Sequence, residues 1–475
     1  MKGGPVFSCA CAALLLLALS PTAGLAAQTL PSAAAAPSTA PTAADFKGSV
    51  ASGAVSPQPV GLSLSEAIQR GLQANLGIIL SGTETASARA QRLSQLQSLL
   101  PSVNFNATEA EMQNDLPAQG LRIPGIPTII GPFGYTDLRA SLNWSLVDLS
   151  ALHNYLATKH NFAAAQLSAQ DARDMVILTV GNAYLLVLAD QSQIESVQAQ
   201  VATAKVSLDQ AIAKHEAGTA PRLDVLRARV DYQALEQRLI VAQNALDKDK
   251  LALARTIGLP LEQTFHLTDT IPYAAYDNLN AKELIHQAET NRKDLAALVE
   301  QTAAAEEQRK AATAARLPTV KVEADYGDIG VNVATSHGTG NASGMLSVPV
   351  FKEFALRGQA KEAQAQLDTE KARLSDKKAQ IDADVRDALL DIAAAQQQVA
   401  VARSSRELAS QELKDAQERY TSGVSDNLAV TQAQQSVAQA DEQYVTSIYR
   451  DNVAKLTLAR MLGEARNYQS YLGGK

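Results

Sequence analysis

The stretch Arg419–Thr431 reads RYTSGVSDNLAVT, and the earlier stretch Lys214–Leu226 reads KHEAGTAPRLDVL. Each places a glycine, Gly423 or Gly218, between two long helix-forming runs, at a point where a chain reversal needs a positive φ. The two glycines are 205 residues apart. A repeat of this length indicates a duplicated domain. The sequence therefore predicts a helical hairpin that occurs twice.

The runs on either side of these turns have a coiled-coil period. Apolar residues occupy every seventh position around the first turn, which favours left-handed supercoiling against neighbouring helices. They are Val180, Val187, Ile194, Val201 and Leu208 before the turn, and Val225, Tyr232, Leu239, Leu246 and Leu253 after it. The second copy keeps this phase with one polar interruption, Asp451. One helix over residues 146–217 would be about 100 Å long.

Composition and charge exclude several classes of protein. Hydrophobic residues make up 46% of the chain but aromatic residues only 4%, which is typical of Ala-rich helices that pack through small side chains. The net charge of −7 gives no indication of nucleic-acid binding. The six histidines lack metal-ligand spacing, and no nucleophile or phosphate-binding motif is recognisable. We therefore expect no catalysis, no metal and no cofactor.

The beginning of the chain reads as a secretory signal. Lys2 precedes an apolar run over Ala10–Leu19, and small residues follow that run. Cys9 and Cys11 lie before or inside the apolar run, so we expect neither a lipid anchor nor a disulfide in the mature chain. No later run contains the ~18 to 20 continuous apolar residues of a transmembrane helix. Export without such a helix leaves the periplasm, the medium or an outer-membrane β-barrel.

The repeat divides the chain into segments, because Gly258 and Gly463 also lie 205 residues apart and end the helices after the two turns. We expect a signal peptide over residues 1–27, a disordered linker rich in Ala, Pro, Ser and Thr over 28–60, a first structural repeat over 61–258, an inter-repeat linker over 259–279, a second repeat over 280–463, and a C-terminal tail over 464–475.

Each repeat changes from a helical to an alternating period after a Leu-Pro pair. The alternation predicts strands at about 102–112 and 136–146 in the first repeat and about 319–328 and 344–351 in the second. The Pro- and Gly-rich segment 116–134 makes the first hairpin loop about twelve residues longer than the second. Each repeat thus reads as helix, β-hairpin, very long helix, turn and long helix.

These strands have the length and the single apolar face needed to cross a bilayer as tilted strands. Four strands cannot close a barrel, and an open sheet edge in lipid leaves backbone groups unpaired. Two copies would give eight strands with a filled interior, whereas three would give twelve strands and a lumen. A transport function requires a lumen, and it therefore favours three copies.

This arrangement resembles the TolC family of outer-membrane efflux channels, from about Leu62 to Gly463. No single short motif is specific, but the ordered set repeated at matching offsets is. The residues that carry the resemblance are the opening Leu64-Ser65-Glu66-Ala67-Ile68 with Asn75, the pairs Leu100-Pro101 and Leu317-Pro318, the segment Val348-Pro349-Val350-Phe351, and the two turn glycines followed by Asp224-Val225-Leu226 and by Leu428.

The resemblance implies a mainly α fold with a membrane β-barrel. It implies a homotrimer with a 12-strand barrel, four strands per chain, in outer-membrane lipid. The barrel is continued through the periplasm by an α-helical tunnel of long antiparallel coiled-coil helices. The implied partners are a periplasmic adaptor protein and an inner-membrane transporter of the RND, ABC or MFS type, and no nucleic acid.

The hairpin turns match the segments with which TolC-like channels meet an adaptor. The candidate docking residues are Gly218 and Thr219 in the first turn and Gly423 and Val424 in the second. Plain turn geometry is the alternative, because both glycines would be needed in either case.

The resemblance also places a gate at the periplasmic end of the lumen. Some members carry rings of aspartate there, and three facing carboxylates would repel one another and raise their pKa values. At those positions this sequence has Ala429 and Gln432. The gate candidates are therefore Asp426, the nearest carboxylate, and Gln432, with Tyr420 and Asp224 at matching family positions. Asp426 serves equally well as the cap of the following helix.

Three aromatic residues lie near the predicted strand-to-helix junctions. Trp144, Phe351 and Phe354 fall where an aromatic girdle at the inner membrane–water interface is expected. Ordinary packing beneath the barrel explains them equally well.

The function that follows is a passive exit duct of a tripartite efflux or type I secretion system. It would export small molecules such as drugs, metals or other toxic compounds, with energy from the partner pump. The alternative is a non-conducting periplasmic coiled-coil scaffold or adaptor. A scaffold, however, has no reason to interrupt its helices twice with hairpins of bilayer length. The cargo stays open, because a wide water-filled duct has little need to recognise what passes.

Overall fold

The structure is a computed structural model, and it describes residues 41–51, 53, 55–277, 280–425 and 427–473. All described elements belong to one unit, Ala40–Lys475. The predicted signal peptide over 1–27 and the gate candidate Asp426 lie outside the described residues.

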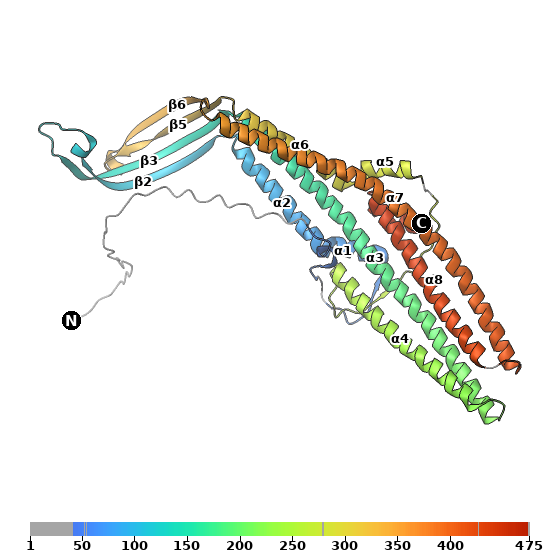
Figure 1. Cartoon of the computed structure of the whole chain (residues 1–475). Coiled ribbons are helices and arrows are strands. Elements are labelled where there is room, and N and C mark those ends of the chain that lie inside the picture. Colours follow the sequence, from blue (N-terminus) through green and yellow to red (C-terminus); the bar gives the residue numbers. More distant parts are fainter. Residues whose placement is uncertain (1–40, 52, 54, 278–279, 426, 474–475) are drawn as a thin grey trace, which may run out of the picture. The chain divides into compact units, whose positions relative to one another are not determined.

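The two halves of this unit repeat one another element by element (Figure 1). The first half contains η1 (Asp45–Lys47), β1 (Val60–Leu62), α1 (Leu64–Ala74), α2 (Leu76–Gln97), β2 (Ser102–Asp115), η2 (Pro117–Gln119), β3 (Ile129–Val147), α3 (Leu149–Glu216) and α4 (Arg222–Ile257). The second half contains β4 (Phe265–Leu267), α5 (Ala281–Asn291), α6 (Lys293–Ala314), β5 (Thr319–Gly330), η3 (Val333–Thr335), β6 (His337–Ser347), α7 (Glu353–Thr421), α8 (Asn427–Met461), η4 (Ala465–Asn467) and α9 (Tyr468–Leu472).

The first helical column of each half breaks at one residue. Asn75 separates α1 from α2 and Arg292 separates α5 from α6, and both have extended backbone angles. The Asn75 side chain accepts from Gly77 N at 2.9 Å, so it caps α2, and it donates to Phe46 O at 2.7 Å. Arg292 instead pairs its guanidinium with carboxylates, including that of Asp384 at 3.1 Å. The same break is thus stabilised by a neutral side chain in one half and by a buried ion pair in the other.

The strands form one antiparallel sheet in the order β2-β3-β5-β6. Among the described residues, β2 and β6 each have a partner on one side only, so both edges of the sheet are open. The last strand differs from the prediction of 344–351, because β6 spans His337–Ser347. Pro349 has no N–H to donate to a ladder, and the segment after Ser347 runs instead to α7.

The two long helical hairpins, α3–α4 and α7–α8, lie side by side (Figure 1). The α3 helix contains 68 residues, which corresponds to about 100 Å. Judged only by length and composition, α3 is apolar enough to cross a membrane, but 61% of its most apolar window is buried in the protein. That window belongs to the helical core. Val176, Val180 and Tyr184 of α3 pack there with Leu62 of β1 and Leu456 of α8.

Short elements form in the three segments predicted as a disordered linker, an inter-repeat linker and a C-terminal tail, and the prediction of disorder over 28–60 is wrong at its end. The end of the 28–60 linker forms η1, whose Phe46 joins the core, and Ser49 Oγ donates to Arg255 O. The inter-repeat segment contains β4, which pairs in parallel with β1. The C-terminal tail forms α9, in which Tyr471 and Leu472 are buried. Elements of three to five residues are too short to show a period, so only packing against the long helices reveals them.

Candidate functional site

The two hairpin turns have the same backbone form. Gly218 and Gly423 each have a φ of +73°, and a Cβ at either position would meet nothing within 4 Å. Thr219 N donates to Lys214 O at 2.9 Å and Val424 N donates to Arg419 O at 3.0 Å, which closes the end of each preceding helix. Glycine is therefore required by the backbone angle and not by crowding. Val424 is 73% exposed, so the second turn presents an apolar side chain to its surroundings.

One contact joins the two turns. Lys214 Nζ, at the end of α3, donates to Tyr420 O at 2.7 Å and lies 3.6 Å from the centroid of the Tyr420 ring. The Tyr420 side chain is buried, and its hydroxyl has no hydrogen-bond partner among the described residues. Burial raises the pKa of Tyr420, and the charge of the Asp224 carboxylate raises it further. This end of the molecule thus has a buried phenol beside a carboxylate.

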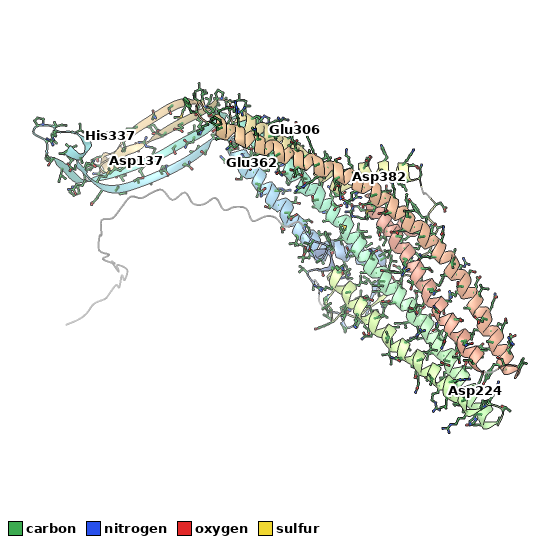
Figure 2. All side chains as sticks on the ribbon, in the orientation of Figure 1. Asp137, Asp224, Glu306, His337, Glu362 and Asp382 are labelled. Carbon is green, nitrogen blue, oxygen red and sulfur yellow. The ribbon has the colours of Figure 1, made fainter. Side chains whose placement is uncertain are left out.

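The structure brings together two of the four gate candidates. Asp224 lies near the end of the α3–α4 hairpin (Figure 2) and is buried, within electrostatic reach of Tyr420. Gln432 is exposed on α8. Because Asp224 is only 6% exposed within one chain, its carboxylate faces protein and not open space.

Further polar side chains join the two hairpins away from the turns. Gln434 Nε2 of α8 donates to Ser207 Oγ of α3 at 2.9 Å. Thr431 Oγ1 of α8 donates to Asp231 Oδ2 of α4 at 2.7 Å. We call this set of contacts, with the Asp441 cluster described next, the polar seam. Several of these contacts involve a carboxylate, and a hydrogen bond to a charged group contributes about 1.5–3 kcal/mol.

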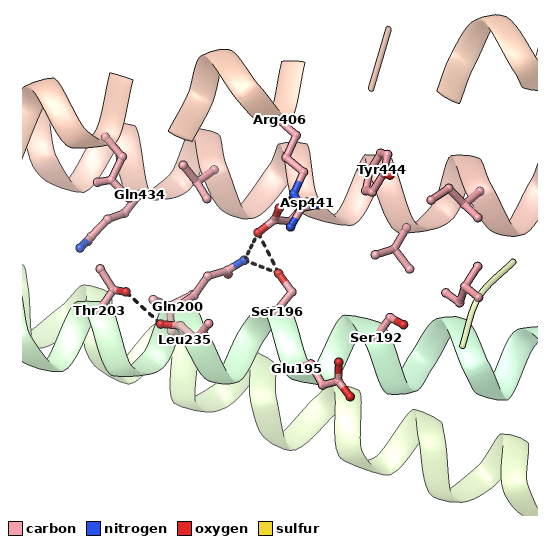
Figure 3. Close-up of a pocket in the computed structure, with 16 residues that line it drawn as sticks. Ser192, Glu195, Ser196, Gln200, Thr203, Leu235, Arg406, Gln434, Asp441 and Tyr444 are labelled. Atoms are coloured by element: carbon pink, nitrogen blue, oxygen red, sulfur yellow. Dashed lines mark hydrogen bonds and ion pairs between the residues drawn. The ribbon is translucent and has the colours of Figure 1, made fainter. Parts of the chain in front are cut away.

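Asp441 of α8 is the residue with most partners in the polar seam (Figure 3). Its Oδ1 accepts from Arg406 Nε of α7 at 2.8 Å. Its Oδ2 accepts from Ser196 Oγ at 2.9 Å and from Gln200 Nε2 at 3.4 Å, both on α3. The Asp441 side chain is 15% exposed, while that of Arg406 is 54% exposed. One carboxylate therefore ties three helices together.

A cavity of about 560 Å³ lies between the two hairpins beside Asp441 (Figure 3). Apolar side chains from both hairpins line it, together with Ile271 of the inter-repeat segment. Other lining residues are Leu235, Val437, Tyr444, Val445 and Ile448. The hairpins are therefore not close-packed here. Within the part of the chain that the structure describes, no group of acidic, His or Cys residues is arranged to hold a metal ion.

The three predicted interface aromatics differ in their surroundings. Trp144 is 37% exposed, and its Nε1 donates to Leu99 O at 3.1 Å, so it ties β3 to the end of the preceding helical column. Phe351 is 99% exposed and Phe354 is 91% exposed. Aromatic side chains of that size are rarely left in water, so the segment that enters α7 presents a surface suited to lipid or to another copy.

Sequence reasoning missed Lys214 and the Asp441 cluster. Arg406 and Asp441 lie on different helices, and Ser196 lies on the other hairpin. These residues meet only at one offset of the two hairpins along their axes. The periodicity within a single helix does not predict that offset. The Tyr420–Asp224 pair was found only because both residues match positions of the TolC family.

Comparison with known proteins gives consistent matches. The family model described as outer membrane efflux protein matches residues 68–259 and 284–464. The chain is 26% identical over 419 residues to the toluene efflux pump outer membrane protein TtgF of Pseudomonas putida, covering 84% of this chain and 83% of that protein. It is similar in fold to VceC of Vibrio cholerae, with a TM-score of 0.73, 20% identity, and coverage of 84% of this chain and 96% of that one. The CmeC channel of Campylobacter jejuni gives a TM-score of 0.73 at 17% identity, over 86% of this chain and 89% of that one.

Proposed function

The chain belongs to the outer membrane efflux protein family, and on this premise we propose that it is the passive exit duct of a tripartite efflux or type I secretion system. It is a TolC-like channel of the outer membrane with its helices in the periplasm, and its homologues are efflux channels and not enzymes. We propose that a periplasmic adaptor links it to an inner-membrane transporter of the RND, ABC or MFS type, which supplies the energy.

We propose small molecules as the cargo. Relatives are named for the efflux of toluene, for the efflux of antibiotics and for the export of pyoverdine. These cargoes share little chemistry. Such variety within one family supports a duct whose cargo is chosen by the partner pump.

The observation that carries the duct is the open four-stranded sheet. Its edges β2 and β6 lack partners within the described chain, and β5 has 12 residues, enough to cross a bilayer. Large apolar side chains are exposed on it, including Phe105 at 71% and Leu346 at 66%. Three copies would close twelve strands around a lumen, which satisfies every edge. A periplasmic scaffold would leave these edges and side chains in water.

We propose that the duct closes at the hairpin turns and meets its adaptor there. Gly218, Thr219, Gly423 and Val424 are exposed at the turns, which suits them to docking. Tyr420 and Asp224 are the best-supported gate residues, because they are buried together where α3 and α7 end. The burial of Asp224 argues against a ring formed by this carboxylate.

The purified full chain is expected to conduct ions. In a planar bilayer we expect discrete current steps with a low open probability, from a particle of three times the mass of the chain without its signal peptide. Single-channel recording and mass determination on the same detergent sample test this. A particle of one chain mass without conductance in any preparation would contradict the duct and favour the scaffold.

Replacing Asp441 with alanine is expected to raise the open probability about tenfold, because hydrogen bonds to a charged group contribute about 1.5–3 kcal/mol. The loss would fall on the arrangement in which Asp441 joins α8 to α3 and α7, which we propose is the closed one. Asp382→Ala is the matched control, since Asp382 makes only an exposed pair within α7. Equal open probabilities in the Asp441→Ala and Asp382→Ala variants would show that the polar seam does not stabilise the closed channel.

A further inference from the structure

The first β-hairpin extends beyond the rest of the sheet. The last pair between β3 and β5 is Thr136 with Gly330, whereas β3 begins at Ile129 and pairs there with Asp115 of β2. Seven residues of β3 thus continue past β5, which is about 23 Å at about 3.3 Å per residue. Figure 1 shows β2 and β3 continuing past the ends of β5 and β6. We call this two-stranded extension, residues 110–135 with the loop 116–128, the arm.

The loop and the β3 strand of the arm are apolar where they are exposed, whereas its β2 strand carries two exposed carboxylates, Glu111 and Asp115. The only charged residue of the arm between Leu116 and Tyr135 is Arg122. The exposed aliphatic side chains are Met112 at 39%, Leu121 at 49%, Ile123 at 47%, Ile126 at 45%, Ile129 at 52% and Ile130 at 37%. A hairpin of two strands is marginally stable alone, and an exposed apolar surface of this kind marks an interaction site.

We do not expect the hydrocarbon layer of the bilayer to contact the exposed apolar surface of the arm. Twelve residues of β5 already reach across a bilayer, for which about 9 to 11 tilted residues suffice. The arm begins where β5 ends, so it lies beyond the hydrocarbon layer when the four-stranded part spans it. The charged residues of the arm are Arg122, Glu111 and Asp115, with a net charge of −1, so they do not attract an anionic lipid headgroup.

The turn between β5 and β6 offers a matching surface. Val331 is 55% exposed and Val333 is 64% exposed there. Within one chain this turn already contacts the β3 side of the arm, since a Cβ at Gly134 would collide with Val331 O. The β2 side of the arm is the open edge of the sheet. In a barrel closed by copies of the chain, that edge meets the next copy's β6, and the arm then stands beside the next copy's turn.

We propose that the arm of each copy packs its β2 side against the β5–β6 turn of the neighbouring copy, forming an apolar collar at the outer end of the duct. This proposal rests on the proposed function, because it requires a barrel closed by several copies. The β5–β6 hairpin of each copy would then lie between two arms, the arm of its own chain and the arm of the neighbouring copy. The collar would remove the exposed aliphatic side chains from water.

Disulfide formation between copies tests the collar. The two cysteines of the sequence, Cys9 and Cys11, lie in the predicted signal peptide, so the pair Met112→Cys and Val333→Cys supplies the only thiols of the mature chain. On oxidation of the assembled full-length protein we expect reducible bands of two and three chains on a denaturing gel. Within one chain β3 separates the two positions, at two strand spacings of about 4.8 Å, beyond disulfide reach.

Two controls make the outcome decisive. Met112→Cys with Val350→Cys is the matched pair, because Val350 is 74% exposed but follows the opposite end of the sheet; it should give no such bands. Native mass is measured on the same samples. A trimer mass with no disulfide bands would overturn the collar and leave the duct intact. A monomer mass would overturn both. Quenching of a fluorophore on Ile126→Cys by lipid-tail quenchers would assign the arm to lipid and also overturn the collar.

Discussion

Replacement of Lys455 by methionine is expected to destabilise the folded chain by about 3–5 kcal/mol. The Lys455 and Asp451 side chains of α8 are both fully buried, with Lys455 Nζ 2.5 Å from Asp451 Oδ2. The ammonium also donates to Ala274 O and lies 5.4 Å from the Tyr273 ring centroid. Methionine fills a similar volume but leaves a buried carboxylate without its cation. Equilibrium unfolding in urea, followed by circular dichroism, measures the loss.

A second variant separates the charge from the packing. Lys455→Met combined with Asp451→Leu removes both charges, and should recover most of the lost stability, because replacing a whole buried pair by apolar groups is often neutral. Lys310→Met is the surface control. Lys310 pairs with Glu306 and Glu307 on α6 at 39% side-chain exposure, so we expect a much smaller loss than for Lys455→Met. Equal losses in the single and double variants would show that the pair contributes through packing alone.

The same variant has a defined pH dependence. Burial raises the pKa of Asp451, and Lys455 opposes this rise. Without Lys455 the folded-state pKa moves further above the unfolded value of about 3.9. The folded state then binds the proton more tightly, so stability falls as pH rises through this interval. The deficit of Lys455→Met should be largest near pH 7 and shrink toward pH 4, as unfolding at both pH values would show.

Asp451 shows what the sequence could and could not predict. The heptad pattern identified it as the polar interruption in the second copy. Its meaning depends on Tyr273 and Ala274, which come from an inter-repeat segment about 180 residues away. Periodicity reports which face of a helix is apolar but not which distant segment crosses that face. The pairing of β1 with β4 escaped prediction for the same reason, since strands of three residues have no measurable alternation.

The positions of the candidate site residues in the fold were predictable to a similar depth, whereas their roles stay predictions. The turn glycines followed from local backbone chemistry, and Tyr420 and Asp224 followed from the family resemblance. The polar seam was not predictable, because Asp441 meets Ser196 only at one offset of the two hairpins along their axes. The error at the end of β6 was avoidable, since Pro349 within the predicted strand already argued against a ladder there.

The two Gly→Ala substitutions at Gly463 and Gly423 are expected to differ sharply, although both residues have nearly the same φ, +71° and +73°. At Gly423 a Cβ would meet nothing within 4 Å, so alanine costs only the left-handed backbone angle, about 1–2 kcal/mol. At Gly463 a Cβ would lie 2.8 Å from Asn291 C and 2.9 Å from Arg292 N. Backbone atoms cannot rotate away, so we expect about 2–5 kcal/mol there.

Urea unfolding of both variants at one pH measures the difference directly. Because the backbone cost is common to both, the excess at Gly463 reports the packing of the α8 end against the break between α5 and α6. Gly423→Ala should still assemble and conduct, since its turn is exposed, whereas Gly463→Ala should lose folded protein on expression. Equal losses would mean that the α5–α6 break moves to admit a methyl group, and that the end of the second repeat is held by η4 and α9 instead.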